Sequence, residues 1–164
     1  MSKPKLTAQR VRELFDYDPE KGELRWRTRL SNRHAVGDIA GCRRDDGTFT
    51  VGISGARFLV HRIVWLYCYG EFPTQWIDHA NGNPSDNRIC NLRLATPSQN
   101  IANSKKKPGS SKFKGVSRKQ GRWYARVRVN YRHIYLGYFD TEEEAHAAYV
   151  AAAVHHFGQF ARAA

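Results

Sequence analysis

Residues 76–100 read WIDHANGNPSDNRICNLRLATPSQN, and this stretch decides the fold of the middle of the chain. It begins with a strand pattern, breaks into a loop rich in Asn, Asp, Gly and Pro, and resumes as a short strand over residues 91–95. Thr96 then has the position of a helix N-cap, with Pro97 at the first helical position and Gln99 completing a capping box. The pattern therefore predicts a β-hairpin followed by a helix.

Three polar residues of this stretch suit phosphodiester hydrolysis, which needs an activated water and neutralisation of the charge on the phosphate. The predicted hairpin and helix can bring Asp78, at the end of the first strand, close to Asn100 in the first helical turn. A carboxylate and an amide oxygen are ligands that a hard divalent cation prefers. The imidazole of His79 can take a proton from the attacking water. An isolated Asp-His pair is common in loops, so the pair by itself does not identify a catalytic site.

Residues 61–104 as a whole resemble the HNH endonucleases of phage and intron origin, including the homing type. The motifs that carry the resemblance are Asp-His-x-Asn-Gly-Asn, Asp-Asn-Arg, Asn-Leu-Arg and Thr-Pro-Ser-Gln-Asn, in this order. The resemblance implies a ββα-metal nuclease core in which His79 is the general base and Asn91 fixes the loop that orients it. It also implies that Asp78 and Asn100 hold one divalent cation, with Mg²⁺ expected and Mn²⁺ as the alternative.

Two further segments fit the same family. His61 matches the pattern upstream of the nuclease motif, where it is read either as a structural residue or as a support behind the catalytic residues. Residues 14–27 resemble the opening of phage HNH proteins.

Residues 1–60 predict an N-terminal α/β extension. Apolar residues from Leu6 to Phe15 have helical spacing, residues 16–22 are typical of a turn, and residues 22–29 and 48–60 alternate as strands do. The apolar run that follows, residues 60–69, predicts a helix that packs in the core.

The composition points to a polyanionic partner. The 164 residues include 27 Lys and Arg against 15 Asp and Glu, a net charge of +12, which favours nucleic acid over a membrane surface and disfavours a small-molecule substrate. The net charge is +4 over residues 1–60, zero over 61–104 and +8 over 105–164. No run approaches the ~18 apolar residues that span a bilayer. The three cysteines are far apart in the sequence, which argues against a disulfide framework or a zinc ribbon and indicates a reducing compartment.

The basic part of the chain predicts a linker, residues 105–111, and a small domain, residues 112–164. Strand patterns at residues 113–118, 122–130 and 133–139 predict a three-stranded antiparallel sheet, and Thr141 with Glu144 forms a second capping box that opens a helix. Alternation along the middle strand gives one apolar face, which suits packing on the helix, and one cationic face.

This domain resembles the ethylene-response-factor (Apetala-type) DNA-binding domain. The shared motifs are Lys-Gly-Val, Gly-Arg-Trp-Tyr-Ala-Arg-Val-Arg and Tyr-Leu-Gly-Tyr-Phe-Asp-Thr-Glu-Glu-Glu-Ala. The resemblance implies that the sheet binds double-stranded DNA through Lys114, Arg126, Arg128, His133 and Tyr135. The full set of candidate DNA-binding residues adds Arg118, Arg122 and Tyr124. Arg126 replaces an acidic residue typical of the plant members, so their target sequence is not carried over.

The sequence thus predicts an α+β protein: an N-terminal extension and a ββα-metal nuclease core, linked to a three-stranded antiparallel sheet packed on one helix. The expected activity is that of a monomeric, metal-dependent DNA endonuclease that nicks duplex DNA, in the cytoplasm of a bacterium or of a phage host. Removing residues 105–164 is expected to weaken DNA binding more than cutting. Two alternatives stay open: a non-catalytic DNA-binding regulator with a decayed nuclease core, and a protein that binds structured RNA.

Overall fold

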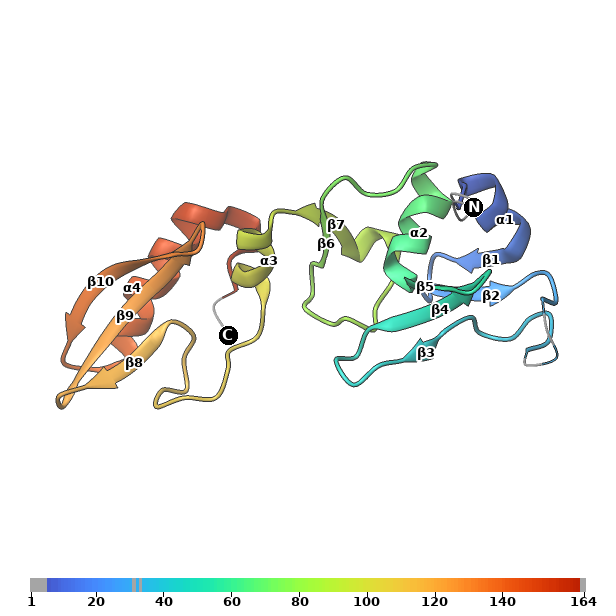
Figure 1. Cartoon of the computed structure of the whole chain (residues 1–164). Helices are drawn as coiled ribbons and strands as arrows, with labels where there is room; N and C mark the ends of the chain where they lie inside the picture. Colours follow the sequence, from blue (N-terminus) through green and yellow to red (C-terminus); the bar gives the residue numbers. More distant parts are fainter. Residues whose placement is uncertain (1–5, 31, 33, 163–164) are drawn as a thin grey trace. The chain divides into compact units, whose positions relative to one another are not determined.

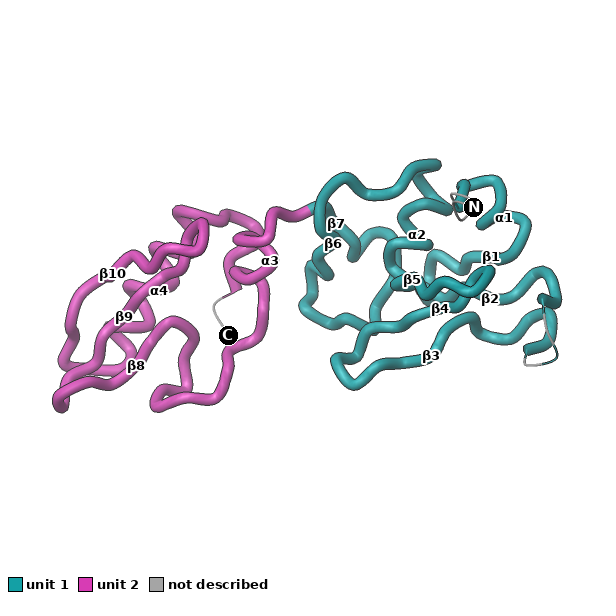
Figure 2. Tube along the Cα trace, viewed as in Figure 1, with its two compact units in different colours: residues 1–94 teal, residues 95–164 magenta. Residues whose placement is uncertain are grey.

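The computed structural model describes residues 6–30, 32 and 34–162. Helices and strands are mixed along the chain (Figure 1), in agreement with the α+β class. The chain divides into two compact units, residues 1–94 and 95–164 (Figure 2). This boundary falls inside residues 61–104, which the sequence analysis treats as one nuclease core. Within the described residues, no helix combines the length and the apolar character needed to cross a membrane.

The described part of the N-terminal unit contains three small sheets, two α-helices and one short 3₁₀-helix. Its elements in chain order are α1 (Ala8–Leu14), β1 (Phe15–Asp18), β2 (Glu23–Trp26), β3 (Cys42–Arg43), β4 (Phe49–Ile53), β5 (Ala56–Leu59), α2 (Val60–Tyr69), β6 (Trp76–His79), η1 (Ile89–Asn91) and β7 (Leu92–Ala95), the last of which ends at the unit boundary. β1 pairs with β2, β4 lies between β3 and β5, and β6 pairs with β7.

Local sequence signals explain most of these element ends. Thr7 caps α1 by accepting a hydrogen bond from the amide of Arg10 at 3.2 Å, and Gly70 ends α2 with a φ of 84°. The turn predicted over residues 16–22 starts too early, because β1 extends through Asp18. The strand expected over residues 48–60 is interrupted by a turn, so that it forms the hairpin of β4 and β5.

The core of the N-terminal unit forms between its two helices and the strands beside them. Val11 and Leu14 of α1 and Ile63 and Val64 of α2 are fully buried, and they share one apolar cluster with Phe15. The helical spacing seen in the sequence therefore marks the core-facing sides of both helices.

The C-terminal unit is a three-stranded antiparallel sheet covered on one face by a helix. Its elements are α3 (Pro97–Asn103), β8 (Val116–Lys119), β9 (Arg122–Val129), β10 (Arg132–Phe139), α4 (Glu142–Phe157) and η2 (Gly158–Phe160). Both expected capping boxes are present, at Thr96 with Gln99 and at Thr141 with Glu144. The strand expected to start at residue 113 begins only at Val116.

Small side chains let α4 approach the sheet closely. Ala145, Tyr149 and Ala153, each one helical turn apart, are buried against Ala125 and Val127 of β9. A Cβ atom on Gly115 would lie 2.0 Å from the Tyr149 ring, so only glycine fits where the chain passes Tyr149. Ala102 of α3 belongs to the same apolar cluster, which makes α3 a part of this unit.

Candidate active site and nucleic-acid interface

Asn91 links the two sides of the loop between β6 and β7. Its side-chain oxygen accepts a hydrogen bond from the amide of Asn81 at 2.9 Å, and its side-chain nitrogen donates to the carbonyl of Asp86 at 2.8 Å. Its own carbonyl accepts a bond from the amide of Ala80 at 2.9 Å. With only 6% of its surface exposed, Asn91 joins the two sides of the loop through these hydrogen bonds.

A carboxylate and further polar side chains stiffen the same loop. Asp86 accepts hydrogen bonds from the side chain of Asn81 at 2.7 Å and from two guanidinium nitrogens of Arg88 at 2.8 and 2.6 Å. The bonds from Arg88 lower the pKa of Asp86 to about 2, so this carboxylate stays ionised at neutral pH. The loop that follows His79 is therefore held by a charged hydrogen-bond network at the surface.

His79, at the end of β6, is buried with 8% of its surface exposed. Its Nε2 lies 3.2 Å from the side-chain oxygen Oδ1 of Asn87, which is itself 3% exposed. With this oxygen as the acceptor, Nε2 carries the proton and Nδ1 is the nitrogen that can accept one. The contact is thus consistent with the tautomer that carries its proton on Nε2.

His61, in the first turn of α2, packs its ring edge-on against the ring of His79. The ring centroids are 5.2 Å apart and the planes are at 89°. Burial is the main reason that the pKa of His61 falls to about 4, and the nearby His79 and Arg62 lower it further. His61 is therefore neutral at physiological pH and supports one side of the His79 ring.

Asp78, beside His79 on β6, faces a different partner. Its Oδ2 accepts a hydrogen bond from Nε of Arg93 on β7 at 2.8 Å, and its side chain is 4% exposed. In this ion pair, the positive charge of Arg93 compensates the negative charge of the buried Asp78 carboxylate. Asp78 and His79 thus point to different neighbours, as adjacent strand residues do.

The hairpin of β1 and β2 anchors the loop from the side. The Tyr17 hydroxyl donates to the carbonyl of Asn87 at 3.0 Å and accepts from the amide of Ile89 at 2.8 Å, while burial raises the pKa of Tyr17 to about 12. A Cβ atom on Gly22 would lie 2.4 Å from the nitrogen of Arg88, so the backbone of the hairpin turn touches the loop directly. The N-terminal extension is therefore built into the support of His79.

Asn100, the second expected metal ligand, lies in the first turn of α3 and thus in the C-terminal unit, whereas Asp78 lies in the N-terminal unit. Among the described residues, no three His, Cys, Asp or Glu side chains gather as a metal site. A metal would therefore depend on oxygen ligands such as one carboxylate and one amide, a donor set that suits Mg²⁺ or Mn²⁺ better than softer metals. The three cysteines are free and exposed.

The outer face of the C-terminal sheet is cationic and aromatic. Strand pairing places Tyr135 opposite Arg126 and His133 opposite Arg128, and the pairing shifts by one residue between Tyr135 and Gly137. This bulge brings Tyr138 onto the same face, opposite Tyr124. The rings of Tyr124, Tyr135 and Tyr138 lie 5.6–6.2 Å apart, and we call them the tyrosine cluster.

Arginines surround the tyrosine cluster. The guanidinium of Arg122 lies 5.8 Å from the Tyr138 ring, and that of Arg126 lies 6.0 Å from the Tyr124 ring. Arg122 also bonds to Asp140 at 3.2 Å. Of the expected DNA-binding residues, Arg122, Tyr124, Arg126, Arg128, His133 and Tyr135 share this outer face.

Two of the expected DNA-binding residues lie elsewhere. Arg118 pairs with Trp123, which faces the core, and its guanidinium lies 5.5 Å from the Trp123 ring. Lys114 precedes β8, and its ammonium donates to the carbonyls of Ile101, Ala102 and Ser104 at the end of α3. Burial lowers the pKa of Lys114 to about 8. The strand register and this contact at the end of α3 therefore place both side chains away from the outer face of the sheet.

Comparison with known proteins assigns the central segment to a family. Residues 58–102 match the family model of HNH endonucleases. This segment of the chain is therefore similar to HNH endonucleases. An HNH endonuclease of Acanthamoeba polyphaga mimivirus is 34% identical over 116 residues, which are 69% of this chain and 60% of the relative. The matched region thus includes the buried loop around His79.

Shorter similarities reach two other proteins. Protein 3.8 of Escherichia phage T7 is 42% identical over 59 residues, 35% of this chain and 49% of the relative. An APETALA2-like protein 2 of rice, Oryza sativa, is 52% identical over 54 residues, 31% of this chain and 12% of the relative. The chain spans less than two thirds of each of these relatives.

Three residues that make contacts in these sites were not predicted from the sequence. Asn87 holds His79, Arg93 pairs with Asp78, and Tyr138 completes the tyrosine cluster. Asn87 and Arg93 stand inside motifs that were recognised, but loop geometry decides which neighbour each one meets. Tyr138 faces outward only because of the bulge, which no alternation pattern predicts.

Proposed function

We propose that this chain is a metal-dependent endonuclease that hydrolyses phosphodiester bonds of double-stranded DNA, with the HNH domain as the cutting site. The observation that carries the proposal is the buried His79, held at Nε2 by Asn87 inside the segment that matches HNH endonucleases. One such site per chain gives a nick as the product of a monomer. The viral sources of two relatives support a phage or viral origin, with activity in the host cytoplasm.

Each residue of the domain has a separate task in this proposal. Nδ1 of His79 takes the proton of the attacking water, while Asn87 holds the other ring nitrogen. Asn91 keeps the loop in place, and His61 limits rotation of the His79 ring. Asp78 and Asn100 would hold the divalent cation. When bound, this cation would neutralise charge on the phosphate and on the departing 3′ oxygen.

Nicking of supercoiled plasmid tests the proposal. We expect wild-type protein with Mg²⁺ or Mn²⁺ to convert supercoiled DNA to open circles, and His79→Ala to do so about 100-fold more slowly or worse, since a general base contributes roughly 10²–10⁴-fold. His155→Ala is the matched control, because His155 is an exposed histidine on α4. Equal nicking by wild type and His79→Ala would refute the assignment of the base.

The rival function is a non-catalytic DNA-binding regulator with a decayed nuclease core. It predicts tight, salt-dependent binding and no nicking with any divalent metal. The complete loop network around Asn91 favours the nuclease, because a core released from selection has no need to keep these buried polar contacts paired.

The outer face of the C-terminal sheet is proposed to bind duplex DNA and so to position the nuclease. Its arginines can contact phosphates and base edges, and the similarity to a rice APETALA2-like protein supports this role. The tyrosine cluster also offers rings on which RNA bases could stack. Binding to duplex DNA and to structured RNA at the same salt concentration separates the two, and we expect DNA to bind more tightly.

A further inference from the structure

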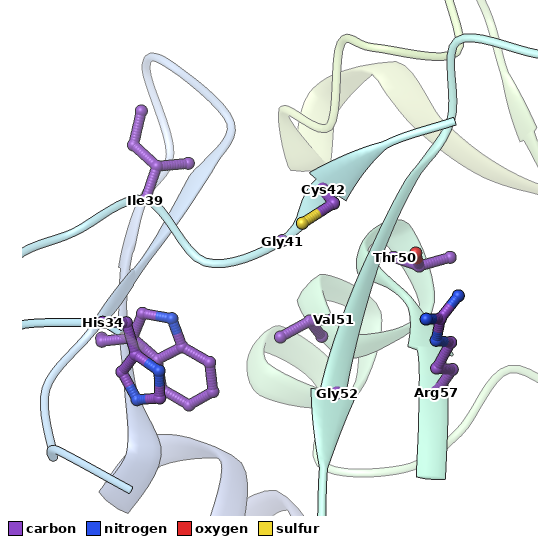
Figure 3. Close-up of a pocket in the computed structure, with 9 residues that line it drawn as sticks. His34, Ile39, Gly41, Cys42, Thr50, Val51, Gly52 and Arg57 are labelled. Carbon is purple, nitrogen blue, oxygen red and sulfur yellow. The ribbon is translucent and has the colours of Figure 1, made fainter. Parts of the chain in front are cut away.

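The N-terminal unit contains a hollow where the chain passes from one sheet to another. Ile39 bridges to Arg25 of β2, and the amide of Ala40 donates to the carbonyl of Leu24 at 2.7 Å. Two residues later Cys42 pairs with Thr50 of β4. The chain thereby leaves β2 and joins β4, and a cavity of about 490 Å³ lies at the crossing (Figure 3).

One wall of this cavity is aromatic. Trp26 and His34 both line it, with ring centroids 3.9 Å apart and planes at 17°. The indole is fixed from behind by Phe15 of the core, at 4.6 Å between centroids. Because Trp26 is buried between Phe15 and His34, the ring face open to a planar group that enters the cavity is that of His34, which the indole holds from behind.

On the other side of the cavity, strands β4 and β5 provide a positively charged side chain and unfilled space. Arg57 of β5 is the cross-strand partner of Gly52 of β4, so both lie on one face of the sheet. Figure 3 shows Arg57 on the same side of β4 as Thr50, away from His34. Arg57 is exposed, and none of the ion pairs described for residues 6–30, 32 and 34–162 involves it. A Cβ atom on Gly52 would meet no atom within 4 Å.

The residues that line the cavity indicate which kind of ligand could bind there. The cavity is bounded by stacked rings, a threonine hydroxyl and one guanidinium, and no Asp or Glu lines it. Its volume is in the range of pockets for small ligands, about 300–1,000 Å³. A flat ring linked to an anionic group meets these features together, and a nucleotide is that combination.

We propose that this cavity takes one unpaired nucleotide of a DNA strand, with its base on the ring of His34, which Trp26 supports, and its phosphate on Arg57. The proposal rests on the proposed function in one respect, namely that DNA is the polyanion the chain meets. It adds a second kind of contact, in which a base outside the duplex stack is held at the N-terminal unit.

The test uses the full chain without divalent metal and a single-stranded DNA 12-mer that carries one 2-aminopurine. Stacking on aromatic rings quenches 2-aminopurine fluorescence, so we expect saturable quenching by wild-type protein. Gly52→Val places a branched side chain inside the cavity and narrows it, and because the φ of Gly52 lies outside the left-handed region, valine fits there without backbone strain. We expect this variant to abolish the quenching and to weaken binding about tenfold.

Charge is controlled separately. Arg57→Ala is expected to weaken binding about tenfold, a loss comparable to one charge-assisted contact. Arg44→Ala removes the same charge from a residue that lies outside the cavity lining, and is expected to change binding less than threefold. Equal losses in the two variants would show that only net charge matters, and would overturn the proposal.

Two outcomes decide the remaining questions. Quenching by Gly52→Val equal to that of wild type would place the base elsewhere, for example on the tyrosine cluster, and would overturn the proposal. If thermal unfolding shows that Gly52→Val is not folded, His34→Ala replaces it, because His34 lies in a loop and its loss should likewise abolish quenching. Plasmid nicking is measured on the same variants, so a chain that quenches but does not nick refutes the nuclease and not the cavity.

Discussion

At the scale of single residues, two asparagines, Asn91 and Asn87, hold the loop that follows β6. The position of Asn91 between the strands follows from its motif, and the structure gives it hydrogen bonds on both sides of the loop. The partner of His79 could not be inferred in this way. Asn87 is eight residues away through a loop without periodicity, and only the folded loop turns its amide toward Nε2.

The neutral state of His61 makes a prediction about stability and pH. The pKa of His61 is about 4 in the folded chain and near 6.5 when unfolded, so between these values the unfolded chain binds a proton that the folded chain does not. Stability is therefore full above pH 6.5 and falls as the pH drops toward 4, by at most about 3 kcal/mol from this group.

His61→Phe keeps an aromatic ring in place but cannot titrate, so its loss of stability between pH 7 and 4.5 should be smaller than that of wild type. Urea unfolding at the two pH values measures the difference, and His155→Phe serves as an exposed control. The same fall in wild type and His61→Phe would mean that His61 does not contribute to the acid sensitivity.

At the scale of secondary structure, alternation and capping boxes predicted the C-terminal strands and helix but not which arginines share a face. Arg118 and Arg126 are both exposed basic residues of the sheet. The observed register nevertheless pairs Arg118 with the core-facing Trp123, and Tyr135 with Arg126. A shift of one residue exchanges the two faces of a strand. The position at which β8 starts, Val116, therefore decides which face of the sheet carries Arg118.

The register predicts different effects for these arginines on DNA binding. Replacing both Arg126 and Arg128 by alanine should weaken binding at low salt and reduce the slope of log K against log[salt] by roughly 2, because each phosphate contact contributes about 0.9. Arg118→Ala removes one charge from the other face and should leave the slope nearly unchanged. Fluorescence anisotropy with a labelled duplex at several salt concentrations measures the slopes, and an equal effect per arginine in all variants would argue against the outer face.

At the scale of the whole chain, the unit boundary revises the expectation about truncation. The sequence suggests a division at the basic residues 105–111, yet α3 packs with the C-terminal unit. Ala102 is buried in its core, the hydroxyl of Ser98 accepts a hydrogen bond from the amide of Asn130 at 3.0 Å, and Lys114 bonds to the end of α3. The composition of residues 105–111 indicates a flexible segment. It does not show whether α3, the helix before this segment, packs with the N-terminal or the C-terminal unit.

A fragment of residues 95–164 should therefore be more stable than one of residues 105–164. The shorter fragment loses the burial of Ala102 and the contacts of Ser98 and Lys114, which together contribute on the order of 2 kcal/mol. Urea unfolding followed by circular dichroism measures both fragments. Equal stability would mean that α3 does not belong energetically to this unit. By the same reasoning, a chain cut after residue 104 leaves the helix that carries Asn100 without its packing partners.

The contact between the N-terminal hairpin and the loop after His79 determines how much of the chain has to accompany His79 if the proposed site is transferred to another protein. Gly22 approaches the backbone of Arg88 so closely that no side chain fits, and the Tyr17 hydroxyl bridges Asn87 and Ile89. The family model of HNH endonucleases matches only from residue 58 onward. A graft of residues 58–102 into another protein would leave His79 on an unsupported loop. A graft designed to keep the proposed site therefore has to begin with α1 and include the hairpin of β1 and β2.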